Sequence, residues 1–129
     1  MANGYYGDNW DEIEEMVKPL DEELERFASD KKLSFIKSER SPGYRAFRWE
    51  TDIGRLIEIF LESEEHRTWR LGITAYEDRK DGRYWKTETI YMPGSISTLH
   101  KNLDDLLEAS WMTVSNWKTE DLYNASRAS

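Results

Sequence analysis

The chain contains no cysteine among its 129 residues, and it contains only two histidines. The lack of cysteine excludes disulfides, thiol nucleophiles and thiolate metal sites. It also fits a reducing compartment, and we expect a cytoplasmic protein. The first residues have neither a basic segment nor an apolar run, so we expect no signal peptide. No stretch approaches the roughly 18 consecutive apolar residues of a membrane-spanning helix, so we expect no membrane partner.

Nucleotide-binding and hydrolase motifs are also missing. The sequence has no GxGxxG, no GxxxxGK[ST] and no GxSxG pattern. The formal net charge is −8, which opposes binding to nucleic acid because neutralisation of phosphates by basic residues supplies much of that affinity. A small basic group at Arg79, Lys80 and Arg83 has acidic neighbours. We therefore expect no cofactor and no nucleic-acid partner.

Aromatic residues are abundant. They make up 13% of the chain, with six tryptophans among them, which is too many for a disordered acidic tail. The length is that of one domain, and we find no internal repeat and no linker. We therefore predict a single domain over residues 1–129.

Residues 8–28 carry the clearest helical pattern. Their apolar residues recur at spacings of three and four, which places them on one stripe: Trp10, Ile13, Val17, Leu20, Leu24 and Phe27. Asp8 is the expected N-cap. Pro19 interrupts the pattern, since an interior proline removes a hydrogen bond and clashes with the preceding turn. Either the helix kinks there, or two helices meet and Pro19 lies in the first turn of the second.

Residues 33–92 predict a five-stranded antiparallel meander. Five segments rich in aromatic and β-branched residues are separated by turn residues; they span 33–38, 44–50, 55–62, 68–78 and 84–92. All apolar residues fall on one face if the first three hairpins pair as follows: Phe35 with Phe47, Leu33 with Trp49, Trp49 with Ile57, Phe47 with Ile59, Leu61 with Trp69, and Ile59 with Leu71.

The last hairpin contains the stretch "EDRKDGRYW" at residues 77–85. A three-residue loop with Gly82 in the left-handed conformation places Ala75 opposite Thr87. A shift of one residue would instead put Glu88 opposite Ile73 and mix charged with apolar residues. We therefore predict the three-residue loop, which gives one face Trp69, Leu71, Ile73, Ala75, Trp85, Thr87, Thr89 and Tyr91.

Two helices are expected after the sheet. The first covers 95–111, with Ser95 or Ser97 as its N-cap and with inward residues Leu99, Leu103, Leu106, Leu107 and Trp111. The second is short, covers 116–124, and buries Trp117 and Tyr123. The predicted fold class is α+β in the order α-β5-α-α, with the N-terminal and C-terminal helices packed on one face of the sheet.

The opposite face of the sheet, here called the outer face, combines spaced aromatic residues with arginines. Such a combination is typical of binding hot spots. The candidate partner-binding residues are Ile36, Arg48, Phe60, Arg70, Tyr76 and Tyr84. Two alternatives stay open: an ordinary solvated face, and a face that the chain's own C-terminus covers.

Two groups of residues contain a histidine. The first group is Glu62, Glu64 and His66, which alternate as the ligands of a divalent cation would in an extended segment. They lie, however, where a turn is needed. The second group is His100, Asp104 and Glu108, which share one helical face. Their pattern is that of the solvent-exposed side of an amphipathic helix. We predict no catalytic residue and no metal site.

The preferred function is that of a small, acidic, non-catalytic binding protein: an adaptor, an inhibitor, an immunity protein or a chaperone-like protein that binds another protein through the outer face. The alternative is a small-ligand-binding protein with an apolar pocket between sheet and helices, lined by Trp49, Trp69, Trp85 and Tyr91. A cavity above about 300 Å³ would support it. An enzyme of unfamiliar type is the third option.

A homodimer is a further option for the partner. The meander leaves two free edges, at residues 33–38 and 84–92, and a free edge can pair with another chain. Lys37 and Lys86 lie on these edges and oppose such pairing.

Overall fold

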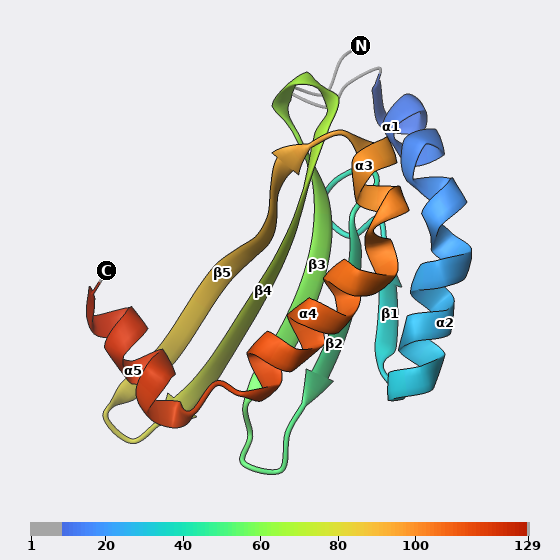
Figure 1. Ribbon diagram of the computed structural model, residues 1–129. Coiled ribbons are helices and arrows are strands. Elements are labelled where there is room, and N and C mark those ends of the chain that lie inside the picture. Colours follow the sequence, from blue (N-terminus) through green and yellow to red (C-terminus); the bar gives the residue numbers. More distant parts are fainter. Residues whose placement is uncertain (1–8, 129) are drawn as a thin grey trace.

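The computed structural model, which describes residues 9–128, has an α+β fold (Figure 1). The order of its elements is α1 (Trp10–Val17), η2 (Lys18–Leu20), α2 (Asp21–Lys31), β1 (Ser34–Lys37), β2 (Arg45–Glu50), β3 (Leu56–Glu64), η3 (Glu65–Arg67), β4 (Thr68–Arg79), β5 (Gly82–Gly94), α3 (Ile96–Lys101), α4 (Leu103–Ser115) and α5 (Thr119–Ala128). The five strands form one antiparallel sheet in the order β1-β2-β3-β4-β5. The predicted class and the five-stranded meander are confirmed.

The N-terminal helices meet at Pro19. This residue lies in the first turn of η2, where the backbone N–H groups have no partner within the helix, so a proline costs no hydrogen bond. The predicted stripe continues across it, and the residues buried along it are Ile13, Val17, Leu20, Leu24 and Phe27. Trp10 is an exception, because it lies at the start of α1 and is 38% exposed. The N-cap predicted at Asp8 lies outside the described residues.

The C-terminal helices differ from the expected bounds. Ser95 caps α3, and its Oγ accepts a hydrogen bond from the Thr98 N–H at 3.1 Å. The single helix predicted over 95–111 is divided at Asn102, whose φ of −111° and ψ of 14° are not helical. The last helix runs from Thr119 to Ala128 instead of 116–124.

The first two hairpins have the predicted register, with Phe35 opposite Phe47 and Phe47 opposite Ile59. In the third hairpin the register differs by two residues, and Ser63, not Leu61, pairs with Trp69. Strand β3 extends to Glu64, and the short η3 turn with left-handed His66 and Arg67 closes the hairpin. A shift of two keeps every side chain on its expected face.

The fourth hairpin differs from the prediction by one residue, and this shift reverses the faces of β5 near the turn. Arg79 pairs with Gly82 across a two-residue loop, and Thr74, not Ala75, pairs with Thr87. Trp85 and Thr87 therefore lie on the outer face, where Trp85 is 38% exposed. A β-bulge near Ile90 restores the expected pair of Leu71 with Tyr91.

Helix α5 explains why the charged side chains of β5 face inward. The ring of Tyr123 lies 4.9 Å from that of Tyr84, and the Lys86 ammonium lies 5.3 Å from the ring of Trp117. Tyr84 and Lys86 thus pack against α5 and the segment before it, and Figure 1 shows α5 beside the start of β5. The prediction allowed only apolar residues to face the helices. A tyrosine ring and the methylene groups of a lysine can also pack against a helix while their polar ends stay in solvent.

A buried ion-pair network joins the sheet to the start of α5. Glu77 is 2% exposed on the inward face, and it accepts hydrogen bonds from Arg55 Nε at 2.6 Å and from Thr119 Oγ1 at 3.1 Å. Arg79 also pairs with it. Arg55 in turn donates to the backbone carbonyl of Trp117 at 2.7 Å. Burial alone would raise the pKa of Glu77, but these hydrogen bonds and the arginine charges outweigh burial and hold the pKa below its ordinary value of 4.5.

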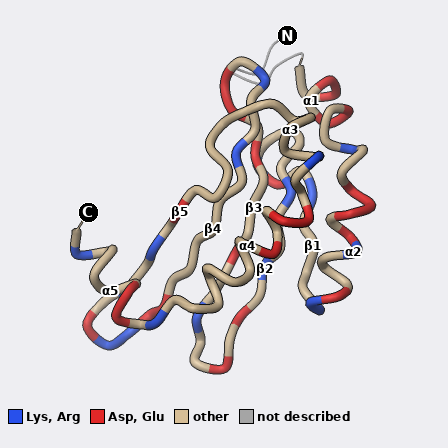
Figure 2. The backbone as a smooth tube through the Cα atoms, in the orientation of Figure 1, with Lys and Arg blue, Asp and Glu red and all other residues tan. Residues whose placement is uncertain are grey.

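A second buried cation fastens the N-terminal helices. Arg45 is 3% exposed, and its guanidinium pairs with Asp21 of α2 at 2.7 Å and with Glu14 of α1 at 3.2 Å. Acidic residues are frequent along α1 and α2 (Figure 2). One buried arginine therefore anchors α1 and α2 to the sheet, and another anchors the start of α5.

Replacement of Glu77 by alanine should lower the free energy of unfolding by about 3 kcal/mol, because it leaves Arg55 buried without its partner. Urea denaturation at neutral pH measures this. The stabilising contribution of Glu77 is present above its unfolded-state pKa and is lost as the pH falls through the lower folded-state pKa. The difference between wild type and variant should therefore shrink on acidification below about pH 4.5.

Asp78 provides a matched control, since it follows Glu77 on the same strand and also pairs with an arginine, Arg83, at 2.8 Å. This pair is exposed, and exposed pairs contribute little. Asp78→Ala should leave the urea midpoint nearly unchanged. Equal losses in the two variants would show that the Glu77 network does not hold the fold together.

Candidate functional site

Phe60 lies on the outer face as predicted, but it is only 8% exposed. It packs with Tyr44 and Ala46, and Ile36 packs against the same group. The ring crosses Gly72 so closely that a Cβ at position 72 would lie 2.5 Å from it. Phe60 therefore fills a small apolar cluster of the chain itself.

The two predicted arginines of the outer face are paired within the chain. Arg48 donates to Glu39 at 2.8 Å and to Glu58 at 2.9 Å. Arg70 pairs with Glu62 and lies 5.1 Å above the ring of Phe60. Both charges are thus already compensated.

Tyr76 and Tyr84 are on different faces of the sheet. Tyr76 stays on the outer face beside Trp85, and the Arg83 guanidinium lies 4.6 Å above its ring. Tyr84 faces α5, so its predicted place on the outer face is wrong. A partner-binding role for the six residues remains a prediction.

The segment that approaches the outer face is the loop 38–43, which contributes Glu39 to the ion pair with Arg48. The C-terminal helix α5 packs on the opposite face, against Tyr84. Cover of the outer face by the C-terminus, one of the sequence alternatives, is therefore wrong.

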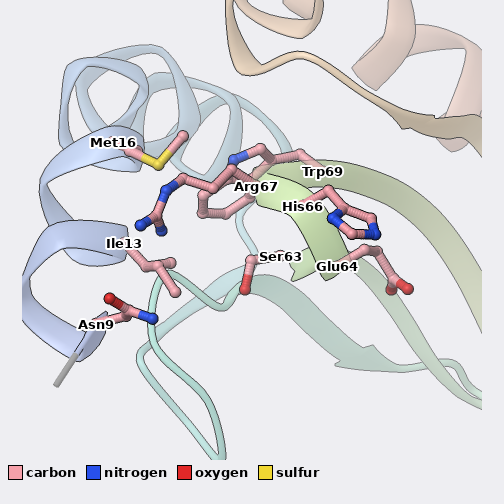
Figure 3. A pocket seen from close by; sticks show the side chains of 8 residues that line it. All are labelled: Asn9, Ile13, Met16, Ser63, Glu64, His66, Arg67 and Trp69. Atoms are coloured by element: carbon pink, nitrogen blue, oxygen red, sulfur yellow. The ribbon is translucent and has the colours of Figure 1, made fainter. Parts of the chain in front are cut away.

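A pocket of about 340 Å³ lies between α1 and the β3–β4 turn (Figure 3). The residues that line it are Asn9, Ile13, Met16, Ser63, Glu64, His66, Arg67 and Trp69. Of the four residues predicted to line a pocket between sheet and helices, only Trp69 is among them. Trp49 packs against Trp111, with ring centroids 5.2 Å apart, and Trp85 faces outward.

Two residues that line the pocket each carry a buried polar side-chain atom with no hydrogen-bond partner among the described residues. These atoms are Ser63 Oγ and Trp69 Nε1, which belong to residues directly opposite each other on β3 and β4. Ser63 is 7% exposed and Trp69 is fully buried. An unsatisfied buried polar group costs about 1–3 kcal/mol, so such groups are rare and call for a physical explanation.

The wall behind Trp69 is held rigidly. Gly43, with φ of +76°, approaches the indole so closely that a Cβ there would lie 2.5 Å from Cη2. The loop is fixed to α1 by Glu14, which accepts hydrogen bonds from Ser38 Oγ at 2.7 Å and from the Gly43 N–H. Any larger residue at position 43 would displace the Trp69 ring.

Charged and polar side chains surround the apolar part of the pocket. In Figure 3, His66 and Glu64 lie on one side of Trp69, and Ile13 and Met16 lie on the other. Arg67 donates to Glu12 at 3.0 Å. Burial raises the pKa of Glu64, and the neighbouring carboxyl of Glu62 raises it further.

The arrangement suits binding better than catalysis. A catalytic serine needs a base within hydrogen-bond reach, and Ser63 Oγ has no such partner among the described residues. His66 lines this pocket, whereas His100 lies 3.3 Å from Glu23 on the helical side of the molecule. Burial, followed by the carboxyl of Asp104, raises the pKa of Glu23.

The described part of the chain contains no group of three or more His, Asp or Glu side chains placed to hold a metal ion. Glu62 and Glu64, two of the three residues weighed as metal ligands, both approach Arg70, at 3.4 Å in the case of Glu64. Within residues 9–128, no helix is long and apolar enough to cross a membrane.

Comparisons with protein-family models, with curated proteins and with solved structures each found no match to this chain.

Sequence reasoning missed Ser63 as a site residue, although a signal was present. Ile57, Ile59 and Leu61 alternate as inward residues of β3, and Ser63 is the next inward position. A serine in that series indicates a polar group directed at the core. The prediction placed it in the turn, because it ended the strand two residues too early.

Ser63→Ala should raise the free energy of unfolding by about 1 kcal/mol, because it removes a buried hydroxyl that has no partner. Urea denaturation measures the change. Ser110→Ala is the matched control, since Ser110 is also buried but donates to the Leu106 carbonyl at 2.8 Å. We expect no gain from the control, because the lost hydrogen bond offsets the higher helix propensity of alanine. Clear destabilisation by Ser63→Ala would mean that its hydroxyl is satisfied in the folded protein.

Proposed function

We propose that this protein is a non-catalytic binding protein, and that it holds a small ligand in the pocket between α1 and the β3–β4 turn. The single observation that carries the proposal is a pair of buried, unpartnered polar atoms, Ser63 Oγ and Trp69 Nε1, on residues that line a pocket of about 340 Å³. A ligand that hydrogen-bonds to them would remove the cost of their burial. The volume is at the small end of the range for ligand pockets, about 300–1,000 Å³.

The lining defines the chemistry of the ligand. An indole N–H can only donate, so the group that meets Trp69 must be an acceptor, such as a carbonyl or carboxylate oxygen. The serine hydroxyl can donate or accept. Ile13, Met16 and the Trp69 ring supply apolar contact beside these polar atoms. A small, partly apolar molecule with an oxygen acceptor fits this combination.

Protein binding through the outer face is the second candidate function. It is favoured by Trp85, which is 38% exposed and paired with Tyr76 on that face. The other anchors expected from the sequence are weaker candidates, since Phe60 is buried and Arg48 and Arg70 are paired within the chain.

The ligand proposal is tested by titrating ¹⁵N-labelled protein with benzoate, benzamide and benzylamine and following the tryptophan indole N–H signals. The six tryptophans give six such signals, and Trp69→Phe identifies the relevant one. Benzoate or benzamide should shift the Trp69 signal with a dissociation constant of about 1 mM, which for nine heavy atoms is roughly 0.5 kcal/mol per atom. Benzylamine lacks an oxygen acceptor and should leave it unchanged.

Ser63→Ala should weaken this binding about threefold to tenfold, as expected for one lost hydrogen bond, and Ser110→Ala should not affect it. If neither benzoate nor benzamide shifts the Trp69 signal, or if benzylamine shifts it equally, the pocket does not recognise an oxygen acceptor and the proposal is wrong.

A further inference from the structure

Strand β5 forms a long free edge of the sheet. It spans 13 residues and, within residues 9–128, forms strand pairs only with β4, while α5 lies beside its first residues (Figure 1). The opposite edge, β1, has only four residues. Natural proteins keep free edges short or interrupt them, because unpaired backbone groups are a template for another strand. An edge as long as β5 therefore needs an explanation.

The register of the last hairpin determines which backbone groups of β5 are free. The residues that flank a two-residue loop, here Arg79 and Gly82, form a hydrogen-bonded pair, and such pairs alternate with non-hydrogen-bonded ones. Thr74 and Thr87 are then a non-hydrogen-bonded pair, in agreement with the 2.8 Å between their hydroxyl oxygens. The N–H and C=O groups of Trp85, Thr87 and Thr89 consequently point away from β4, toward the free edge.

In a pairing of two copies along this edge about a two-fold axis, the charges distinguish the registers centred on Lys86, Thr87 and Glu88. Centring the pair on Lys86 would place two ammonium groups opposite each other. Centring it on Glu88 would place two carboxylates opposite each other. Centring it on Thr87 places each Lys86 opposite the Glu88 of the other copy, and each Trp85 opposite Thr89.

We propose that two copies of this protein associate through β5 in the register centred on Thr87 and so form one continuous antiparallel sheet. Two oppositely charged cross-strand pairs stabilise this register, whereas like charges destabilise its neighbours. The regular part of the interface ends near Ile90, where the β-bulge begins, and Pro93 beyond it has no N–H to donate. The occupant of the edge is therefore another copy of this chain, and not an arbitrary extended peptide.

The absence of cysteine from the chain makes a direct test simple. In the proposed register the two copies of residue 87 form a hydrogen-bonded pair with Cα atoms about 5.5 Å apart, within the range that a disulfide spans. Thr87→Cys should therefore form a covalent dimer under mild oxidation at least tenfold faster than Met92→Cys. Met92 is the matched control because it lies on the same strand and is more exposed, at 71%, but would not meet its own copy.

A charge exchange tests the register independently. Lys86→Glu and Glu88→Lys should each abolish self-association, since each places like charges across the interface. An equimolar mixture of the two variants should restore a dimer, because both cross-strand pairs are again of opposite charge. Light scattering gives the masses, and circular dichroism verifies that each variant is folded.

Three results would overturn the proposal: a monomeric mass for the wild type at about 0.5 mM, cross-linking of Thr87→Cys no faster than that of Met92→Cys, or a mixture of the charge variants that dimerises no more than either alone. None of these readouts involves the pocket at Ser63 and Trp69, so the outcome is independent of the proposed ligand.

Discussion

Two charged side chains on the inward face of the sheet, Glu77 and Arg45, are buried because partners satisfy them, and this requirement positions the helices that begin and end the chain. Glu77 lies among apolar residues because Arg55, Arg79 and Thr119 surround its carboxylate. The same contacts place the start of α5 over the end of β4 and the start of β5. With α5 in that position, Tyr84 and Lys86 have a surface to pack against, and the last hairpin takes the register that directs them inward.

Ser63 and Trp69 differ from these charged residues, and the proposed ligand site rests on them. They occupy inward positions directly opposite each other, next to the end of α1, and their polar atoms have no partner among the described residues. The buried Arg45 on the same face is, by contrast, paired with Asp21. The proposed ligand would supply the acceptor that the Trp69 indole N–H lacks among the described residues.

Much of the fold could be predicted from the sequence, because the alternation of apolar residues fixes which face of a strand is buried. Phe35, Phe47 and Ile59 paired as expected for that reason. The last hairpin could not be predicted in this way. Trp85 and Tyr84 are both large and aromatic, so their apolar character does not show which of them faces inward. The packing of Tyr84 against α5 determines that it is Tyr84. Likewise the sequence does not indicate that Glu77 is buried, because its partner Arg55 lies 22 positions earlier in the chain. Of the pocket lining, the sequence indicated Trp69 as a pocket residue and singled out Glu64 and His66 only as possible metal ligands, since the pocket depends on the position of α1 over the β3–β4 turn.

The claim that an unsatisfied indole and hydroxyl mark a ligand site is tested most directly by a crystal structure of the protein soaked in benzamide. The expected result is density for the amide in the pocket, with its oxygen about 3 Å from Trp69 Nε1 and its ring against Met16 and Ile13. A structure in which the pocket holds no benzamide, and in which Trp69 Nε1 donates to an atom of the protein itself, would contradict the claim.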